Sequence, residues 1–173
     1  MIWIPARNYT PAWRSCVDLV VIHSAECARV PGAARAVARM FAGSKAPRAS
    51  THYVADDGEI IQCVSERNVA WAAPGANRVG IQIELAGYAH QSADEWLDGA
   101  MLGRVARLVA EICRRWSIPA TKLGAHELLQ GQRGVTGHVD VDAAWHRSDH
   151  WDPGPGFPWP KFLELVRSEG ERI

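Results

Sequence analysis

The chain has 173 residues, of which 47% are hydrophobic and 22% are charged. We expect one domain spanning residues 1–173, because a chain of this size can bury roughly 70% of the surface that its unfolded form exposes. Nineteen basic and nineteen acidic side chains cancel, and this balance gives no field that attracts nucleic acid or an anionic membrane. No apolar run approaches the ~18 residues of a membrane span. We therefore expect a monomer without a nucleic-acid partner and without membrane insertion.

Two features concern the compartment in which the chain is made. The four cysteines form no Cys-x-x-Cys pair, which argues against a thiolate zinc site and a dense disulfide framework, so we expect most of them to be buried thiols. The first twenty residues mix Arg7, Arg14 and Asp18 with apolar residues and lack the basic flank and apolar run of a signal peptide. We expect synthesis in the cytoplasm without a secretory signal.

The first predicted elements are a strand and a helix. Residues 19–22 form a short apolar run ending at His23, which is typical of a strand buried on both faces. Sites often form just beyond the carboxyl end of such a strand, and this makes His23 a candidate functional residue. Residues 33–41 lie between a Pro-Gly pair and Gly43, and their composition predicts a short helix.

A hairpin and a further strand come next. Residues 51–55 and 59–64 are rich in β-forming side chains and are joined by Asp56-Asp57-Gly58. An Asp-Gly pair readily takes the positive φ angles of a tight turn, so these runs predict a β-hairpin. Residues 79–85 alternate in polarity, which predicts a strand with Glu84 near its carboxyl end.

The remaining elements are helical apart from one loop. Residues 93–116 carry apolar side chains at three- and four-residue spacings, which predicts one long amphipathic helix. Residues 131–141 predict a glycine-rich loop that continues into a short strand. Residues 160–170 begin with proline and end with glycine, as a closing helix does. The fold class is therefore α/β or α+β, with a mixed central β-sheet flanked by helices and the strand order left open.

Two histidines and an aspartate have the donor chemistry of a zinc site. His23 ends an apolar run, His138 lies in Gly137-His138-Val139-Asp140-Val141, and Asp152 opens an Asp-Pro-Gly sequence. A catalytic zinc ion takes three nitrogen, oxygen or sulfur ligands and keeps a fourth position open. These three residues satisfy that count and point to metal-assisted hydrolysis. The simpler interpretations are that His23 is a histidine of the core and that Asp152 only forms a turn. A tight turn can also hold a metal ligand in place, so the second interpretation is compatible with a zinc site.

Five separated segments carry a family resemblance in the expected order: IHSAE, STHYVADDGEIIQCV, NRVGIQIELAG, GVTGHVDV and DPGPGFPW. They resemble the zinc-dependent N-acetylmuramoyl-L-alanine amidases of the peptidoglycan-recognition type, a family of phage endolysins, bacterial muropeptide amidases and animal peptidoglycan recognition proteins. The likeness covers about residues 19–166 and implies the mixed-sheet fold of that family. Its details are similar to endolysins of phages that infect actinobacteria.

The resemblance also implies roles for single residues. It places zinc ligands at His23, His138 and Asp152, the same three that ligand chemistry selects. Glu84 matches the family's acidic residue, which would take a proton from the attacking water. His150 stands two residues before the last ligand, where relatives often have a lysine that stabilises the oxyanion. An imidazole can donate the same hydrogen bond but loses its charge near neutral pH.

Candidate substrate contacts are less sharply defined. Some relatives have a tyrosine where this chain has Thr51, so the neighbouring His52 is the candidate contact at this place. His52 would contact either the substrate or another residue of the site, and a purely structural role is equally open. Asn77 is a further candidate. Trp71 and Trp151 can line a groove, since flat aromatic faces suit sugars and peptides, although tryptophan is commoner in cores.

The resemblance implies a peptidoglycan hydrolase that cleaves the amide between N-acetylmuramic acid and L-alanine, with Zn²⁺ as cofactor. The expected setting is phage lysis, in which a separate holin opens the membrane so that the enzyme reaches the bacterial cell wall. One alternative is a non-catalytic peptidoglycan-binding module, which the complete ligand set disfavours. The other is a bacterial amidase that recycles cytosolic muropeptides, which activity on intact walls would exclude and which His150 weakly disfavours.

Overall fold

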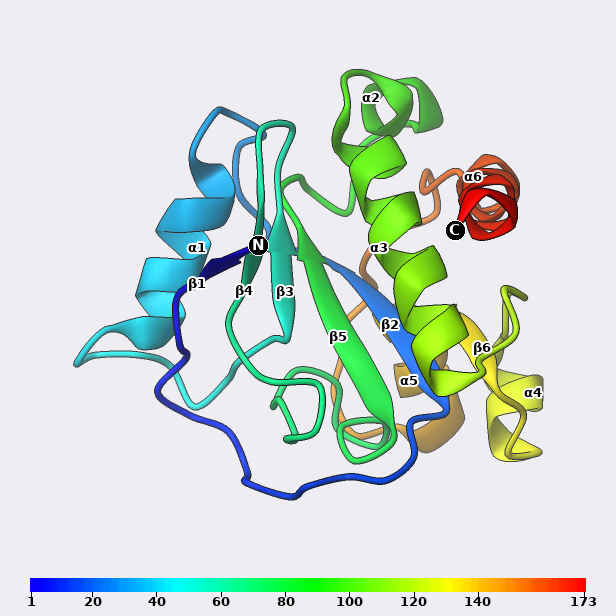
Figure 1. The fold of residues 1–173 in the computed structure, drawn as a ribbon, viewed down its shortest axis with the longest axis horizontal. Coiled ribbons are helices and arrows are strands. Elements are labelled where there is room, and N and C mark those ends of the chain that lie inside the picture. Colours follow the sequence, from blue (N-terminus) through cyan, green and yellow to red (C-terminus); the bar gives the residue numbers. More distant parts are fainter.

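The computed structural model describes residues 1–173 and contains a six-stranded sheet of order β1-β4-β3-β5-β2-β6 (Figure 1). All neighbouring strands are parallel except the β3–β4 pair, which is antiparallel. The strands are β1 (Ile2–Trp3), β2 (Leu19–Ser24), β3 (Tyr53–Ala55), β4 (Ile60–Gln62), β5 (Gly80–Leu85) and β6 (Gly134–Gly137). The helices are α1 (Ala33–Ala42), α2 (Ala93–Leu97), α3 (Met101–Trp116), α4 (Ala125–Leu129), α5 (His138–Trp145) and α6 (Trp159–Arg172). The predicted mixed sheet flanked by helices is confirmed.

Helices cover both faces of this sheet. Successive side chains of a strand point to opposite faces. Val20 and Ile22 of β2 accordingly pack with α3 and α6, and Figure 1 shows α3 passing in front of β2. Leu19 and Val21 point the other way and pack with α4 and α5. Helix α1 covers the β3–β4 part of that second face, so the central strands are buried on both sides.

The register of β2 against β5 brings two polar side chains together. The parallel pairing sets His23 directly opposite Glu84. Because the side chains alternate, His23 shares the face of Val21, and Glu84 shares a face with Gln82. The sheet therefore presents a histidine and two polar residues side by side at the carboxyl ends of neighbouring strands, where ligand sites of α/β sheets form.

Two aspartates in the hairpin turn bind the first turns of helices on both faces of the sheet. The Oδ2 atom of Asp56 accepts the backbone N–H of Ala34 in α1 at 3.0 Å. The Oδ1 atom of Asp57 accepts two backbone N–H groups at the start of α3, at 2.8 and 2.9 Å. Arg29 donates to both oxygens of Asp57 and to backbone carbonyls at the end of α2. These contacts satisfy backbone groups that a helix end leaves unpaired.

The single helix predicted over residues 93–116 is wrong, because the structure divides it into α2 and α3. Asp98, Gly99 and Ala100 separate the two helices, and Gly99 has a φ of +69°, a left-handed conformation that glycine adopts without strain. The apolar spacing continues across this break, with Trp96 and Met101 both fully buried. Periodicity alone therefore gives no sign of the turn that Asp57 and Arg29 stabilise.

The strand predicted to run to Val141 is also corrected. Strand β6 ends at Gly137, and His138 begins α5. The carboxylate of Asp140 accepts the N–H of Gly137 at 3.1 Å, which closes the first helical turn in the manner of an N-terminal cap. The short elements β1 and α4 were not predicted, because so few residues show no periodicity. The closing helix is confirmed, but Gly170 lies inside it.

The other predicted elements are confirmed. The structure forms the strand after residue 18, the helix that starts at Ala33, the hairpin across Asp56-Asp57-Gly58 and the strand that carries Glu84. All four cysteines are free, and two of them, Cys63 and Cys113, are buried. The expectation that most are buried is thus only half met.

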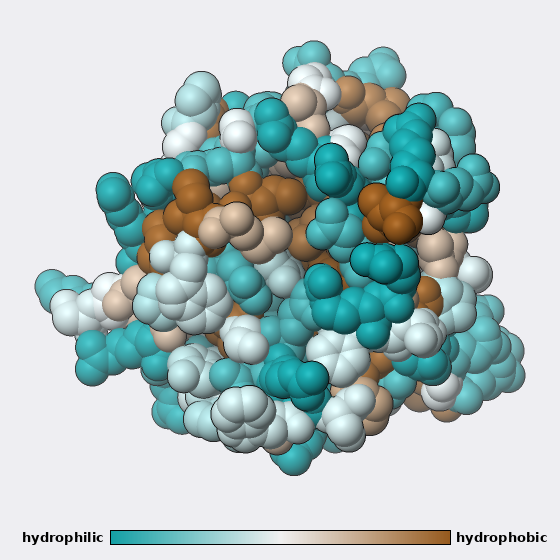
Figure 2. Space-filling view, in the orientation of Figure 1, coloured by the Kyte–Doolittle hydropathy of each residue, from teal (hydrophilic) through white to brown (hydrophobic).

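None of the helices combines the length and apolar character needed to cross a lipid bilayer. Figure 2 shows the face that Figure 1 presents, on which hydrophilic side chains predominate and the hydrophobic areas are limited in extent.

A buried carboxylate joins the end of α3 to the hairpin. Glu66 is 8% exposed and accepts hydrogen bonds from Arg115 at 2.9 and 3.0 Å and from the Tyr53 hydroxyl at 2.6 Å. The indole N–H of Trp116 also donates to it. Burial alone would raise the pKa of Glu66, but the hydrogen bonds from Arg115, Tyr53 and Trp116 lower it below its ordinary value of 4.5. The folded state therefore favours the charged carboxylate.

We expect Glu66→Gln to lower the free energy of unfolding by about 1 to 3 kcal/mol at pH 7, because it weakens charge-assisted hydrogen bonds. A carboxyl group whose pKa is depressed by folding stabilises the protein above its unfolded pKa, and this contribution is lost as the pH falls through the folded pKa. The difference between the two proteins in urea unfolding should therefore shrink from pH 7 toward pH 3. A difference that stays constant over this range would contradict the assignment, and Glu164→Gln on the exposed side of α6 is the control.

Candidate active site

His23 and Glu84 form the floor of the site. The His23 side chain is 2% exposed, and its Nε2 atom lies 2.9 Å from Oε1 of Gln82. An amide oxygen can only accept, so Nε2 carries the proton and donates it. Gly80 leaves room for this amide, because a Cβ atom there would come within 2.9 Å of the Gln82 Nε2 atom. The Nδ1 atom of His23 faces Asp152 and is the ring nitrogen that can bind a metal ion once it has lost its proton.

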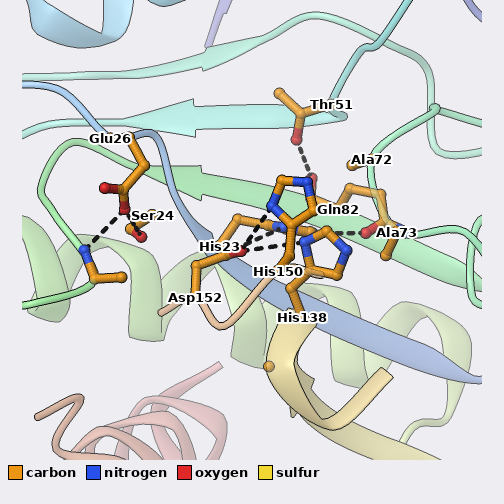
Figure 3. Close-up of polar contacts among 12 residues, drawn as sticks. His23, Ser24, Glu26, Thr51, Ala72, Ala73, Gln82, His138, His150 and Asp152 are labelled. Carbon is orange, nitrogen blue, oxygen red and sulfur yellow. Dashed lines mark hydrogen bonds and ion pairs between the residues drawn. The ribbon is translucent and has the colours of Figure 1, made fainter. Parts of the chain in front are cut away.

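His138 and Asp152 complete a compact cluster with His23 (Figure 3). His138 is the first residue of α5, and the next residue in that helix, Val139, donates its N–H to the backbone carbonyl of Asp152 at 2.9 Å. One carboxylate oxygen of Asp152 lies 3.1 Å from Nδ1 of His23, and the other lies 3.2 Å from Nδ1 of His138. Residues far apart in the sequence are thus held within a few ångströms of one another.

A serine and an aspartate orient the second histidine. The Nε2 atom of His138 lies 3.3 Å from Oγ of Ser148. Ser148 in turn donates its hydroxyl to Oδ1 of Asp142 at 2.9 Å and its backbone N–H to the same oxygen at 2.6 Å. Because the hydroxyl proton goes to Asp142, the oxygen accepts from the imidazole. The Nδ1 atom of His138 therefore also faces Asp152 and is the nitrogen that can bind a metal ion.

The three side chains have the arrangement of a metal site. One ligand atom from each of His23, His138 and Asp152 lies within 4.8 Å of the others, and all three residues are buried. Burial alone would lower the pKa of His23, but the charges of Glu84 and Asp152 raise it to about 9. Burial would likewise raise the pKa of Asp152, yet the two histidines lower it far below its ordinary value. The space between these groups thus favours a positive charge.

Glu84 is the free carboxylate of the site. It is half-buried, and burial together with the nearby charge of Asp152 raises its pKa to about 7, against the opposing effect of His23. No hydrogen bond contributes to this shift, so its oxygens stay free to accept a proton from a bound molecule.

His150 lies at the mouth of the site. Its side chain is 58% exposed, and its Nδ1 atom lies 3.4 Å from Oδ1 of Asp152. Its ring stacks on that of His138, with centroids 4.4 Å apart and planes inclined by 14°. An exposed imidazole in this position can present a hydrogen-bond donor to a molecule that enters the cluster.

These residues line a cavity of about 270 Å³ that opens between β5 and α1. Its wall opposite the cluster is apolar, with Val37, Met40 and Phe41 of α1. Trp71 and His150 also border an adjoining hollow of about 430 Å³, which contains Asn77 and Arg48. The two hollows share Ala49, Trp71, Ala72 and His150 as lining residues, so they adjoin beside the cluster, and we call them together the groove.

The structure places two of the predicted substrate residues in this groove and one outside it. Trp71 lines both parts of the groove, held by a hydrogen bond from its Nε1 atom to the Thr10 hydroxyl at 2.9 Å. Asn77 lines the outer part, while its side-chain oxygen accepts two backbone N–H groups of the neighbouring loop. Trp151 is 51% exposed but lies outside this groove.

His52 requires a correction, because its ring cannot reach a substrate. It is 0% exposed, and its Nδ1 atom accepts the backbone N–H of Gln82 at 2.9 Å. Its Nε2 atom faces Arg14 and the carbonyl of Asn68. Burial and the charge of Arg14 lower the pKa of His52 to about 3. The ring is therefore neutral and structural, and it is hydrogen-bonded to the backbone of β5.

Several residues of the site had not been singled out in the sequence. Gln82 carries a signal, since it lies two positions before Glu84 in an alternating strand and therefore on the same face. Ser148 and Asp142 carry none, because their contact with His138 depends on the course of the loop after α5. Glu26 also lines the cavity, with its Oε1 atom held by the Ser24 hydroxyl and the N–H of Ala89.

Comparison with known proteins decides the family. The family model described as N-acetylmuramoyl-L-alanine amidase matches residues 13–155, most of the chain. The chain belongs to the N-acetylmuramoyl-L-alanine amidase family. N-acetylmuramoyl-L-alanine amidase A of Achromobacter lyticus is 31% identical to this amidase over 181 aligned residues, which cover 98% of the chain and 94% of that relative. Its reaction class is accordingly the hydrolysis of an amide in peptidoglycan.

Solved structures support the fold of this amidase. Staphylococcus aureus hydrolase AmiA, determined in complex with its ligand, matches with a TM-score of 0.73 at 16% identity, covering 97% of this chain and 80% of that one. A mutant endolysin from Bacillus subtilis matches with a TM-score of 0.63 at 17% identity, covering 95% and 97%. At these identities the likeness establishes the shared fold of the sheet and its helices.

Proposed function

We propose that this amidase is a zinc-dependent enzyme that cleaves the bond between the lactyl group of N-acetylmuramic acid and the L-alanine of the stem peptide. The observation that carries the proposal is the buried cluster of His23, His138 and Asp152 beside the free carboxylate of Glu84. A purely binding module has no need of these four groups in one cavity, since burying polar groups is unfavourable unless they are paired.

The donor set fits zinc. Two neutral imidazole nitrogens and a carboxylate oxygen are ligands that catalytic zinc sites use, with a further position left open. Gln82 and Ser148 fix the protons on the far nitrogens of His23 and His138, as the outer partners of metal-binding histidines do. A zinc ion held there would polarise the scissile carbonyl and make a water molecule more acidic.

Glu84 is placed to act as the general base. It lies beside His23 through the β2–β5 register, faces the cavity and is free of hydrogen bonds that would occupy its oxygens. In that position it takes the proton of the attacking water and passes it to the departing amine of L-alanine. Asp152 is held by two histidines, and one oxygen of Glu26 is held by Ser24 and Ala89, so Glu84 is the carboxylate of the cavity with both oxygens free.

His150 is our candidate for stabilising the oxyanion. Its exposed ring, stacked on His138 at the mouth of the cavity, can donate a hydrogen bond toward charge that develops on the carbonyl oxygen. The stem peptide would extend along the groove that Trp71 and Asn77 line, because that groove leads away from the cluster toward the exposed guanidinium of Arg48.

For the biological setting we propose host-cell lysis by a phage. The arrangement of sequence motifs resembles endolysins, and an endolysin shares the fold. In this setting the enzyme acts on the cell wall as a monomer after a separate holin has opened the membrane.

We expect Glu84→Gln to reduce kcat by about 10²- to 10⁴-fold, the usual effect of removing a general base, while its zinc content stays that of the wild type. The assay is mass spectrometry of stem peptides with a free L-alanine amino terminus, released from intact cell walls and, separately, from soluble anhydro-muropeptides. Glu164→Gln serves as the control for loss of a surface carboxylate.

Substantial activity in Glu84→Gln would overturn the role of this residue, and absence of zinc from the wild type would overturn the metal site. Cleavage of soluble muropeptides without cleavage of intact walls would replace the lytic setting with muropeptide recycling.

We expect Ser148→Ala to weaken zinc binding by roughly 10- to 100-fold, as is typical when the outer partner of a metal-binding histidine is removed. Ser148→Thr retains the hydroxyl and should stay close to the wild type. Competition with a chromophoric chelator measures the affinity, and Ser168→Ala in α6 is the control. Equal affinities of Ser148→Ala and Ser168→Ala would show that the contact with His138 does not support metal binding.

A further inference from the structure

The segment from His150 to Asp152 separates two hollows. His150 and Asp152 line the catalytic cavity, whereas Trp151 lines a second hollow of about 290 Å³. The start of α5 divides in the same way, since His138 belongs to the catalytic cavity and Val139 to the second hollow. The two hollows therefore lie on either side of a wall only one chain segment thick.

The second hollow is built around two indole rings. It is lined by Lys122, Val139, Asp140, Trp151, Gly154, Pro155 and Trp159. Trp159 forms a fixed side of it, because this ring packs on Phe157 with centroids 4.7 Å apart. Trp151 forms the solvent-exposed side, with 51% of its surface accessible. The catalytic chemistry uses none of these side chains.

A charged pair stands beside the rings. The Nζ atom of Lys122 lies 4.6 Å from the centre of the Trp159 ring and 2.6 Å from Oδ2 of Asp140. The side chains of Lys122 and Asp140 are 27% and 21% exposed, so the pair still offers donors and acceptors to a ligand. Because the ammonium of Lys122 already lies over the Trp159 ring, the exposed indole of Trp151 is the ring on which a sugar can stack its C–H face, while the charged pair binds its hydroxyls.

The backbone around Trp151 is firmly held. The N–H of Gly154 donates to the carbonyl of Trp151 at 3.1 Å, and the N–H of Val139 donates to the carbonyl of Asp152 at 2.9 Å. A large aromatic side chain held in solvent by a fixed backbone loses little conformational freedom on binding. The exposed indole is therefore carried on a rigid segment of backbone.

We propose that this second hollow is a glycan subsite, which binds saccharide units of the strand that carries the scissile amide. The inference rests on the proposed function, because the amide at the cluster is joined through a short lactyl bridge to a sugar. The groove past Trp71 takes the stem peptide, so the glycan must leave the cavity on another side. A glycan that leaves the catalytic cavity past His150 reaches the second hollow with Trp151 and Trp159.

The occupant follows from this position. The glycan and the stem peptide are both attached to the reacting group and must both pass close to the cluster, and the stem peptide is already assigned to the groove past Trp71. The hollow then contributes to the binding of glycan oligomers and not to that of a single muramyl residue.

The test compares two substrates that carry the same stem peptide, one on a single N-acetylmuramic acid and one on an oligomeric glycan. We expect Trp151→Ala to raise KM for the oligomer by roughly three- to tenfold, the loss given by one aromatic contact. Its kcat on both substrates and its KM for the single-sugar substrate should match the wild type. Trp13→Ala removes an indole that is 81% exposed and lines neither hollow, and it should change nothing.

The outcomes separate this inference from the proposed function. Equal KM values of wild type and Trp151→Ala on the oligomer would overturn the glycan subsite while leaving the amidase intact. A parallel loss on both substrates would also overturn it, because the ring would then act only by holding Asp152 in place. Cleavage of neither substrate by the wild type would instead overturn the proposed function. Quenching of wild-type but not Trp151→Ala fluorescence by an N-acetylglucosamine tetrasaccharide would support the subsite directly.

Discussion

The parallel register of β2 against β5 is the constraint on which the site depends. It sets His23 opposite Glu84, and a shift of β2 by one residue would turn His23 to the apolar face under α3, away from Glu84. The apolar residues before them fix this register, because Val20 and Ile22 must face α3 while Leu19 and Val21 face α4 and α5. The core and the candidate catalytic groups are therefore specified by the same alternation of side chains.

Burying this polar cluster carries a free-energy penalty that the surrounding residues offset. Gln82 and Ser148 each pair with the far nitrogen of a histidine, and Asp152 lies between both rings. One penalty is left, since the side-chain nitrogen of Gln82 is buried without a partner. We attribute this to the need for its oxygen to face His23, which occupies Nε2 and leaves Nδ1 as the nitrogen that can bind the metal ion. Orienting the Gln82 amide toward His23 therefore leaves the amide nitrogen of Gln82 without a hydrogen bond.

The sequence predicted the parts of this structure that have periodicity or a turn signal. It gave the strand before His23, the hairpin at Asp56-Asp57-Gly58 and the strand of Glu84, and its motifs named the residues that the fold brings together. It failed where contacts distant in the sequence decide, as at Gly99, where Asp57 and Arg29 break a helix whose apolar spacing continues. His52 was misjudged because its burial depends on Arg14, 38 residues away. Trp151 was placed in the groove because local sequence does not show to which side of a chain segment a ring points.

The central claim is that two imidazole Nδ1 atoms and one carboxylate converge on a single zinc ion. Crystals of the protein prepared with zinc, measured above and below the zinc absorption edge, test it most directly. The account predicts one anomalous peak contacting Nδ1 of His23, Nδ1 of His138 and the carboxylate of Asp152, with the Gln82 and Ser148 contacts unchanged. No peak at this position, or rings turned so that Nε2 binds the metal, would contradict it.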